Sequence, residues 1–68
     1  MSVAPEPGLV TRAIAALVER GRRGDRLPAE RELANRLGVG RAAVRRALSE
    51  LDAAELTVTR AQAGTFIR

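Results

Sequence analysis

The sequence contains neither cysteine nor histidine, and Phe66 is its only aromatic residue. Without cysteine there is no disulfide and no thiolate metal site. Without histidine the chain lacks the commonest general base and the commonest metal ligand in proteins. These absences argue against an enzyme, and we expect neither a metal nor a cofactor.

Long hydrophobic runs are missing as well. The longest, Ala13 to Val18, falls far below the roughly 20 residues that span a bilayer. Residues 1–8 are polar and contain prolines, so they offer no apolar core of a signal peptide. We therefore expect a cytoplasmic protein without a membrane partner.

Lysine is also absent, so all 12 basic residues are arginine, and the formal net charge is +4. A small basic domain favours a polyanionic partner such as nucleic acid. The 68 residues, of which 46% are hydrophobic, suffice for one small domain but not for a large enclosed active site. Its core has to be built mainly from Leu, Val, Ile and Ala, and we expect the Phe66 side chain to be buried in this core.

Apolar residues recur with helical spacing in three stretches. The first begins at Leu9 and is ended by Gly21. The second opens near Pro28, which suits the first turn of a helix, and Gly38 is a left-handed stop for it. Glu30 and Glu32 lie two positions apart and so point to different sides of this helix. We interpret Glu30 as favourable charge at the helix start and Glu32 as solvated surface.

The third helical stretch runs from about Arg41 to Ala54, and after it the period changes. Residues 57–60 and 65–67 are β-prone, and residues 61–64 can form a turn between them. We expect a loose arm over residues 1–8. Over residues 9–68 we expect a mainly α fold of three helices with a small C-terminal β-hairpin.

The connection Gly38-Val39-Gly40 joins the second and third helices. Two helices joined by a turn of about three to four residues that contains glycine are typical of a helix-turn-helix. On the third helix, one face is apolar, and the other combines small and basic residues. That second face contains Ala42, Arg45, Arg46 and Ser49, with Arg41 on its flank.

The small-and-basic face suits a DNA groove. Ala42 and Ala43 allow close approach, and Arg41 and Arg45, one turn apart, can both reach guanine edges. A good bidentate pair of this kind gives roughly 1–3 kcal/mol of discrimination between bases. We expect Arg46 to contact phosphate instead.

At this point the chain resembles a known family. The resemblance covers roughly residues 9 to 67 and is carried by the following residues: Gly24-Asp25-Arg26-Leu27-Pro28-Ala29-Glu30-Arg31-Glu32-Leu33-Ala34, Leu37-Gly38-Val39, Arg41, Val44-Arg45, Ala47-Leu48, Leu51 and Gly64-Thr65-Phe66-Ile67. They are similar to the N-terminal domain of GntR-family bacterial transcription regulators.

The resemblance implies a winged helix-turn-helix that binds DNA. Arg31 matches a DNA-contacting position of the family, Arg41 and Arg45 match base-contacting positions, and Ala42 and Ala43 match its variable specificity positions. Gln62 to Gly64 would form the tip of the wing, near the minor groove. Arg60, also on the wing, fits a phosphate contact and plain solvation equally well.

Family members are usually homodimers on near-palindromic operators, bound to the bacterial nucleoid, and their C-terminal domain binds a small effector. This chain stops at Arg68, directly after the wing. It therefore fits an isolated DNA-binding domain of a longer regulator or a stand-alone small regulator. An alternative function is a winged-helix interaction module with an acidic protein partner, and a fragment of an enzyme with such a domain is a third possibility.

The chain departs from the family pattern at two informative positions. Gly40 stands where relatives have Ser or Thr, so this DNA-facing position lacks a hydroxyl for a helix cap or a phosphate contact. Glu55 stands where relatives have Gly. Either Glu55 adopts a strained positive φ, or the third helix continues through it.

Overall fold

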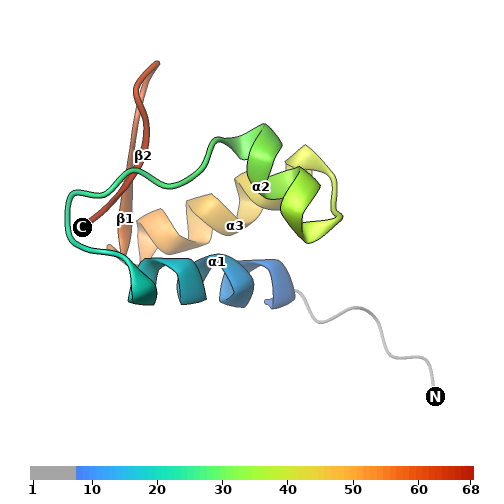
Figure 1. The fold of residues 1–68 in the computed structure, drawn as a ribbon, viewed down its shortest axis with the longest axis horizontal. Helices are drawn as coiled ribbons and strands as arrows, with labels where there is room; N and C mark the ends of the chain where they lie inside the picture. Colours follow the sequence, from blue (N-terminus) through green and yellow to red (C-terminus); the bar gives the residue numbers. More distant parts are fainter. Residues whose placement is uncertain (1–7) are drawn as a thin grey trace.

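The computed structural model describes residues 8–68, which form three helices and a two-stranded hairpin (Figure 1). The helices are α1 (Leu9–Arg20), α2 (Glu30–Leu37) and α3 (Arg41–Ala53). The strands are β1 (Thr57–Arg60) and β2 (Gly64–Ile67), paired antiparallel. The predicted fold class is therefore confirmed, whereas the arm expected over residues 1–8 falls, apart from Gly8, outside the described residues.

The apolar stripes of the helices meet in one core. Ile14 from α1, Leu33 from α2 and Val44 from α3 are fully buried in it, and Ile67 from β2 closes one end. Burying side chains of this size stabilises the fold by roughly 1.5–3 kcal/mol each. Within residues 8–68 no helix is long and apolar enough to cross a membrane.

The Phe66 side chain is not buried in this core. It is only half-buried, because Thr65 and Ile67 on either side of it point inward and are buried. Neighbouring residues in a strand face opposite sides of the sheet, so Phe66 lies on the side away from the helices. The prediction that Phe66 fills the core was therefore wrong, because the buried positions of the strand are its two neighbours, Thr65 and Ile67.

The turn between α2 and α3 follows the prediction. Gly38 has φ +68° and ψ +34°, the left-handed conformation that ends a helix and that glycine adopts without a Cβ clash. Val39 packs against the core and donates its backbone N–H to Ala34 O at 3.1 Å. Gly40 is the N-cap of α3, and no side-chain hydrogen bond caps the helix there.

The end of α3 resolves the alternative at Glu55. The helix stops at Ala53, one residue earlier than expected, and Glu55 has φ +62°. The backbone N–H of Leu56 then donates a hydrogen bond to Leu51 O at 3.0 Å. The Thr57 hydroxyl donates a short hydrogen bond to the Asp52 carboxylate, which ties β1 to the last turn of α3.

A third extended segment, which the sequence interpretation missed, pairs with the hairpin. Leu27 N donates to Thr65 O and Ile67 N to Asp25 O, each at 2.8 Å, and Arg26 faces Phe66 across this pairing. Residues 24–27 thus run along β2, which lies between them and β1. The connection from α1 to α2 is therefore part of the sheet.

We expect Glu55→Gly to raise the free energy of unfolding by about 1 kcal/mol, because glycine at φ > 0 avoids the Cβ clash that glutamate suffers there. For a domain of this size that corresponds to a melting temperature about 4–8 °C higher. Thermal unfolding followed by circular dichroism measures the shift. Glu55→Ala is the control, since it removes the charge but keeps Cβ. A gain as large in the alanine variant would assign the effect to charge instead of backbone strain.

We expect Gly64→Ala to destabilise the domain by about 1–3 kcal/mol, because φ at this position is +117°. An added Cβ would also lie 2.6 Å from Arg26 Nε. That guanidinium can swing away, so combining Gly64→Ala with Arg26→Ala should restore only a small part of the stability. Urea unfolding of the two variants measures both effects. Full recovery in the double variant would mean that crowding dominates over backbone conformation.

Candidate nucleic-acid interface

The polar face of α3 lies open to solvent, as the sequence predicts. Arg41, Ala42, Arg45 and Ser49 are exposed on it. Ala43 differs, because it is half-buried. It lines a small groove between α3 and α1 that also contains Arg46 and, from α1, two residues, Val10 and Thr11. The predicted face therefore divides into a part beside α2 and a part beside α1.

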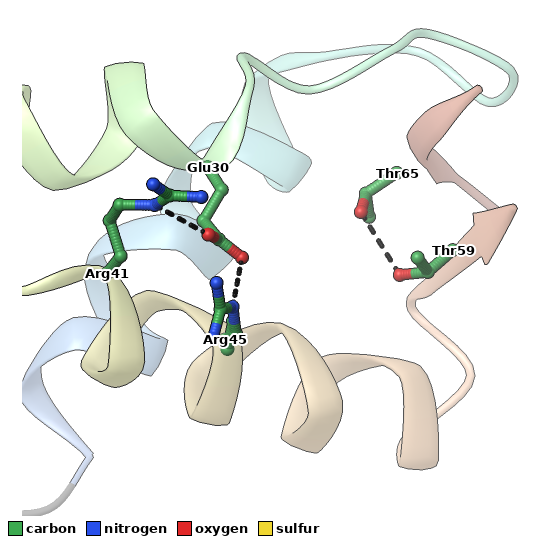
Figure 2. Close-up of polar contacts among 5 residues, drawn as sticks. All are labelled: Glu30, Arg41, Arg45, Thr59 and Thr65. Atoms are coloured by element: carbon green, nitrogen blue, oxygen red, sulfur yellow. Dashed lines mark hydrogen bonds and ion pairs between the residues drawn. The ribbon is translucent and has the colours of Figure 1, made fainter. Parts of the chain in front are cut away.

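Glu30 joins the two central arginines of this face. Figure 2 shows its carboxylate between them: Oε1 accepts a hydrogen bond from Arg41 Nε and Oε2 one from Arg45 Nε, each at 2.9 Å. Glu30 is the first residue of α2, and the arginines are one turn apart on α3. We call these three residues the Glu30 fork. It links the two helices of the helix-turn-helix through their side chains.

The fork orients two exposed arginine side chains. The Arg41 and Arg45 side chains are 53% and 63% exposed, whereas the Glu30 side chain is 24% exposed. Because each arginine donates through Nε, its terminal Nη groups stay available to a ligand. The hydrogen bonds from Arg45 and Arg41 keep the pKa of the Glu30 carboxyl below its usual value, so the fork is charged at neutral pH.

The prediction for Glu30 as charge at a helix start was incomplete, because it missed both arginine partners. They lie 11 and 15 residues away, and no local pattern indicates such pairs. Glu32 does lie on exposed surface, where it pairs with Arg36 at 2.5 Å. That pair had a visible signal, since residues four apart on a helix are neighbours.

Arg31 and Gly40 are exposed on either side of the turn region. Arg31 forms no hydrogen bond or ion pair within the described part of the chain, so its guanidinium is available to a ligand. At Gly40, an added Cβ would meet no atom within 4 Å. The start of α3 is thus uncovered at Gly40, where the first N–H groups of a helix lack i−4 partners.

The wing stands beside α3 and encloses a groove with it. The groove has a volume of about 390 Å³ and extends from the start of α2 across Arg45 and Ser49 to the strands. The hydroxyls of Thr59 and Thr65 lie 3.0 Å apart on the strand side of this groove (Figure 2).

Most of the wing residues predicted to contact DNA are exposed. Arg60 and Gln62 project at the exposed end of the hairpin, and Gln62 has φ +63°. Gly64 is half-buried because the Arg26 guanidinium lies against it. Arg26, which the sequence interpretation did not select, is thereby also brought to the wing. Its position follows from the unexpected pairing of residues 24–27 with β2.

Comparison with known proteins agrees with this geometry. Residues 10–67 match the profile of a family described as bacterial regulatory proteins, gntR family. The chain is 50% identical over 44 residues to the HTH-type transcriptional regulator Rv1152 of Mycobacterium tuberculosis. The matched residues are 65% of this chain and 36% of that protein. The chain therefore spans about a third of the length of this curated relative.

Solved structures with the same fold include complexes with DNA. The DNA-binding domain of AraR in complex with operator ORE1 superposes with a TM-score of 0.87 at 26% identity, covering 97% of this chain and 83% of that one. PhnF from Mycobacterium smegmatis gives a TM-score of 0.80 at 34% identity, covering 87% of this chain and 26% of that one. Transcription regulators of this kind are not a class of enzymes. The chain belongs to the GntR family of bacterial regulatory proteins, and it is a winged-helix DNA-binding domain of that family.

Proposed function

We propose that this domain binds a specific double-stranded DNA sequence by inserting α3 into the major groove, with the wing on the backbone or in the minor groove. The Glu30 fork is the observation that supports this most, because it presents two oriented, exposed guanidinium groups on one helix face. The major groove is about 12 Å wide and admits an α-helix, and arginine recognises guanine through O6 and N7. Arg41 and Arg45 are therefore the proposed base-reading residues.

The rest of α3 supports the same mode of binding. Gly40 leaves the start of the helix open, so that its N–H groups and positive dipole end can bind a phosphate. Ala42 is small and exposed, which lets α3 approach the base edges closely. Ser49 lines the groove toward the wing. Ala43 contributes less to base contacts in this proposal, because it is half-buried toward α1.

Phosphate contacts come from arginines around the fork. Arg31 on α2 and Arg46 on the α1 side of α3 are exposed and make no ion pair with another described residue. Contacts of this kind position a protein on the duplex without reading its sequence. On the wing, Arg60 is assigned the same role, while Gln62 and Gly64 would lie nearest the minor groove.

Glu30 has a role of its own in this proposal. A carboxylate beside DNA repels phosphate, so it lowers the affinity for any sequence. It also orients Arg41 and Arg45 through their Nε atoms, which reduces the cost of ordering them on binding. Glu30 is therefore a positioning residue that favours discrimination over affinity.

We further propose that the protein acts as a homodimer on a near-palindromic operator in the bacterial cytoplasm, associated with the nucleoid. Closed two-fold dimers are the commonest assemblies, and two helix-turn-helix units then read half-sites about one helical turn apart. A small-molecule effector would act through a further domain, for which the longer relatives have the length.

Arg45→Ala should lose base preference. Selection from a random duplex library first identifies the preferred sequence, and titrations of that sequence and of single-base variants then give the discrimination. We expect discrimination at one guanine to fall by about 1–3 kcal/mol in Arg45→Ala and at another in Arg41→Ala.

Arg31→Ala should weaken binding to all sequences equally and reduce the salt slope by about one.

Arg22→Ala is the matched control, because Arg22 is exposed and is not one of the residues that line α3 or the grooves beside it. It should leave base preference unchanged. The proposal fails if Arg45→Ala keeps both its affinity and its preference. It also fails if the wild-type domain shows no binding to duplex at about 50 mM salt, where phosphate contacts are strong.

Glu30→Gln should bind mixed-sequence duplex more tightly than the wild type and distinguish the preferred sequence less well. The substitution removes the negative charge and frees at least one of the two arginines. Glu32→Gln is the control, because it removes a carboxylate two residues away that pairs only with Arg36. A Glu30→Gln variant with increased affinity and unchanged discrimination would show that Glu30 only repels DNA and does not position the arginines.

A further inference from the structure

The side of the sheet that faces away from the helices carries an unassigned surface. Thr57, Thr65 and Ile67 point inward and are buried. The alternation of a strand places Val58 and Phe66 on the opposite side, where they are direct cross-strand partners and remain half-buried. Figure 1 shows the helices on one side of the hairpin only, so no helix covers this pair.

A shallow groove of about 720 Å³ lies over this pair. Val58 and Phe66 form its apolar floor, Gly24 and Ile67 border it, and three arginines surround it. The arginines are Arg23, Arg60 and Arg68. We call this feature the outer groove. It shares no lining residue with the groove between α3 and the wing, so it is a separate surface.

The charged side chains around the outer groove are all of one sign. Within residues 8–68, Arg23, Arg60 and Arg68 form no ion pair, and no aspartate or glutamate lines the groove. Asp25 is the acidic residue closest to Arg23 in the chain, and its carboxylate accepts a hydrogen bond from Arg22 N instead. Three uncompensated guanidinium groups thus frame an apolar floor.

This combination of charge and apolar surface identifies the chemistry of a partner. Arginines alone would suit the phosphates of DNA, but phosphates gain nothing from contact with Val58 and Phe66. A polypeptide can satisfy both parts of the groove at once, since its carboxylates pair with guanidinium groups bidentately and its apolar side chains cover the floor.

We propose that the outer groove binds an acidic polypeptide segment that carries an apolar side chain. The apolar side chain lies over Val58 and Phe66, and flanking carboxylates pair with Arg23, Arg60 and Arg68. Binding there leaves the Glu30 fork free. Arg60 is the one residue assigned both to DNA and to this partner, so the two compete for Arg60 and not for α3. The proposal stands whether or not α3 reads DNA.

The test uses a short fluorescent peptide of alternating Glu and Leu and the 68-residue domain. Titration with the peptide should shift the backbone amide resonances of Gly24, Val58 and Phe66 and leave those of Arg41 and Arg45 unchanged. A peptide of alternating Glu and Ser should bind several-fold more weakly, because it cannot cover the apolar floor.

Variants separate the groove from general charge. Arg23→Gln and Arg68→Gln should each weaken peptide binding about two- to fivefold, the amount expected for an exposed ion pair. Arg22→Gln is the matched control, since it removes the same charge one residue outside the groove. Val58→Thr keeps the size and β-branching of the side chain and should weaken binding of the Glu–Leu peptide while leaving that of the Glu–Ser peptide unchanged.

Three results would overturn the proposal. Equal effects of Arg22→Gln and Arg23→Gln would mean that the peptide senses only net charge. Resonance shifts at Arg41 and Arg45 would mean that it occupies α3 in place of DNA. Weaker duplex binding by Arg23→Gln and Arg68→Gln, with peptide binding unchanged, would assign the groove to the DNA backbone.

Discussion

The burial of Ile14, Leu33 and Val44 in one small core is the constraint on which the rest of the structure depends. The chain has no disulfide, so this contact fixes how α2 lies against α3. That arrangement in turn brings Glu30 within reach of Arg41 and Arg45. The same core therefore determines the fold and, through the fork, the geometry of the exposed face.

Features that depend on neighbours in sequence could be predicted. The three apolar stripes, the left-handed stop at Gly38 and the β-prone segments all act within a few residues, and each is confirmed. The glycine-containing turn then indicated a helix-turn-helix, which the family match confirms. The exposed face of α3 followed from helical periodicity alone.

Features that depend on distant neighbours could not be predicted. The partners of Glu30 and the pairing of residues 24–27 with β2 are contacts between elements whose relative position only the packed core defines. Phe66 illustrates the sensitivity of a strand, because a shift of one residue exchanges the buried and exposed sides. At Glu55 the sequence left two backbone conformations open. The structure has the strained one, with positive φ, and the next residue, Leu56, donates its N–H to Leu51 O.

The acidic residues explain why the positive charge is concentrated where it is. Glu30 and Glu32 neutralise arginines within α2 and α3, whereas Glu50 and Asp52 accept hydrogen bonds from threonine hydroxyls and stabilise the packing of α1 and β1. Carboxylates thus serve internal contacts, and they leave the arginines of the wing and the outer groove unpaired among the described residues. Arginines therefore gather on two separate surfaces. On one, a carboxylate orients the arginines, which suits recognition of a rigid duplex. On the other, unpaired arginines frame an apolar floor, which suits a flexible acidic chain.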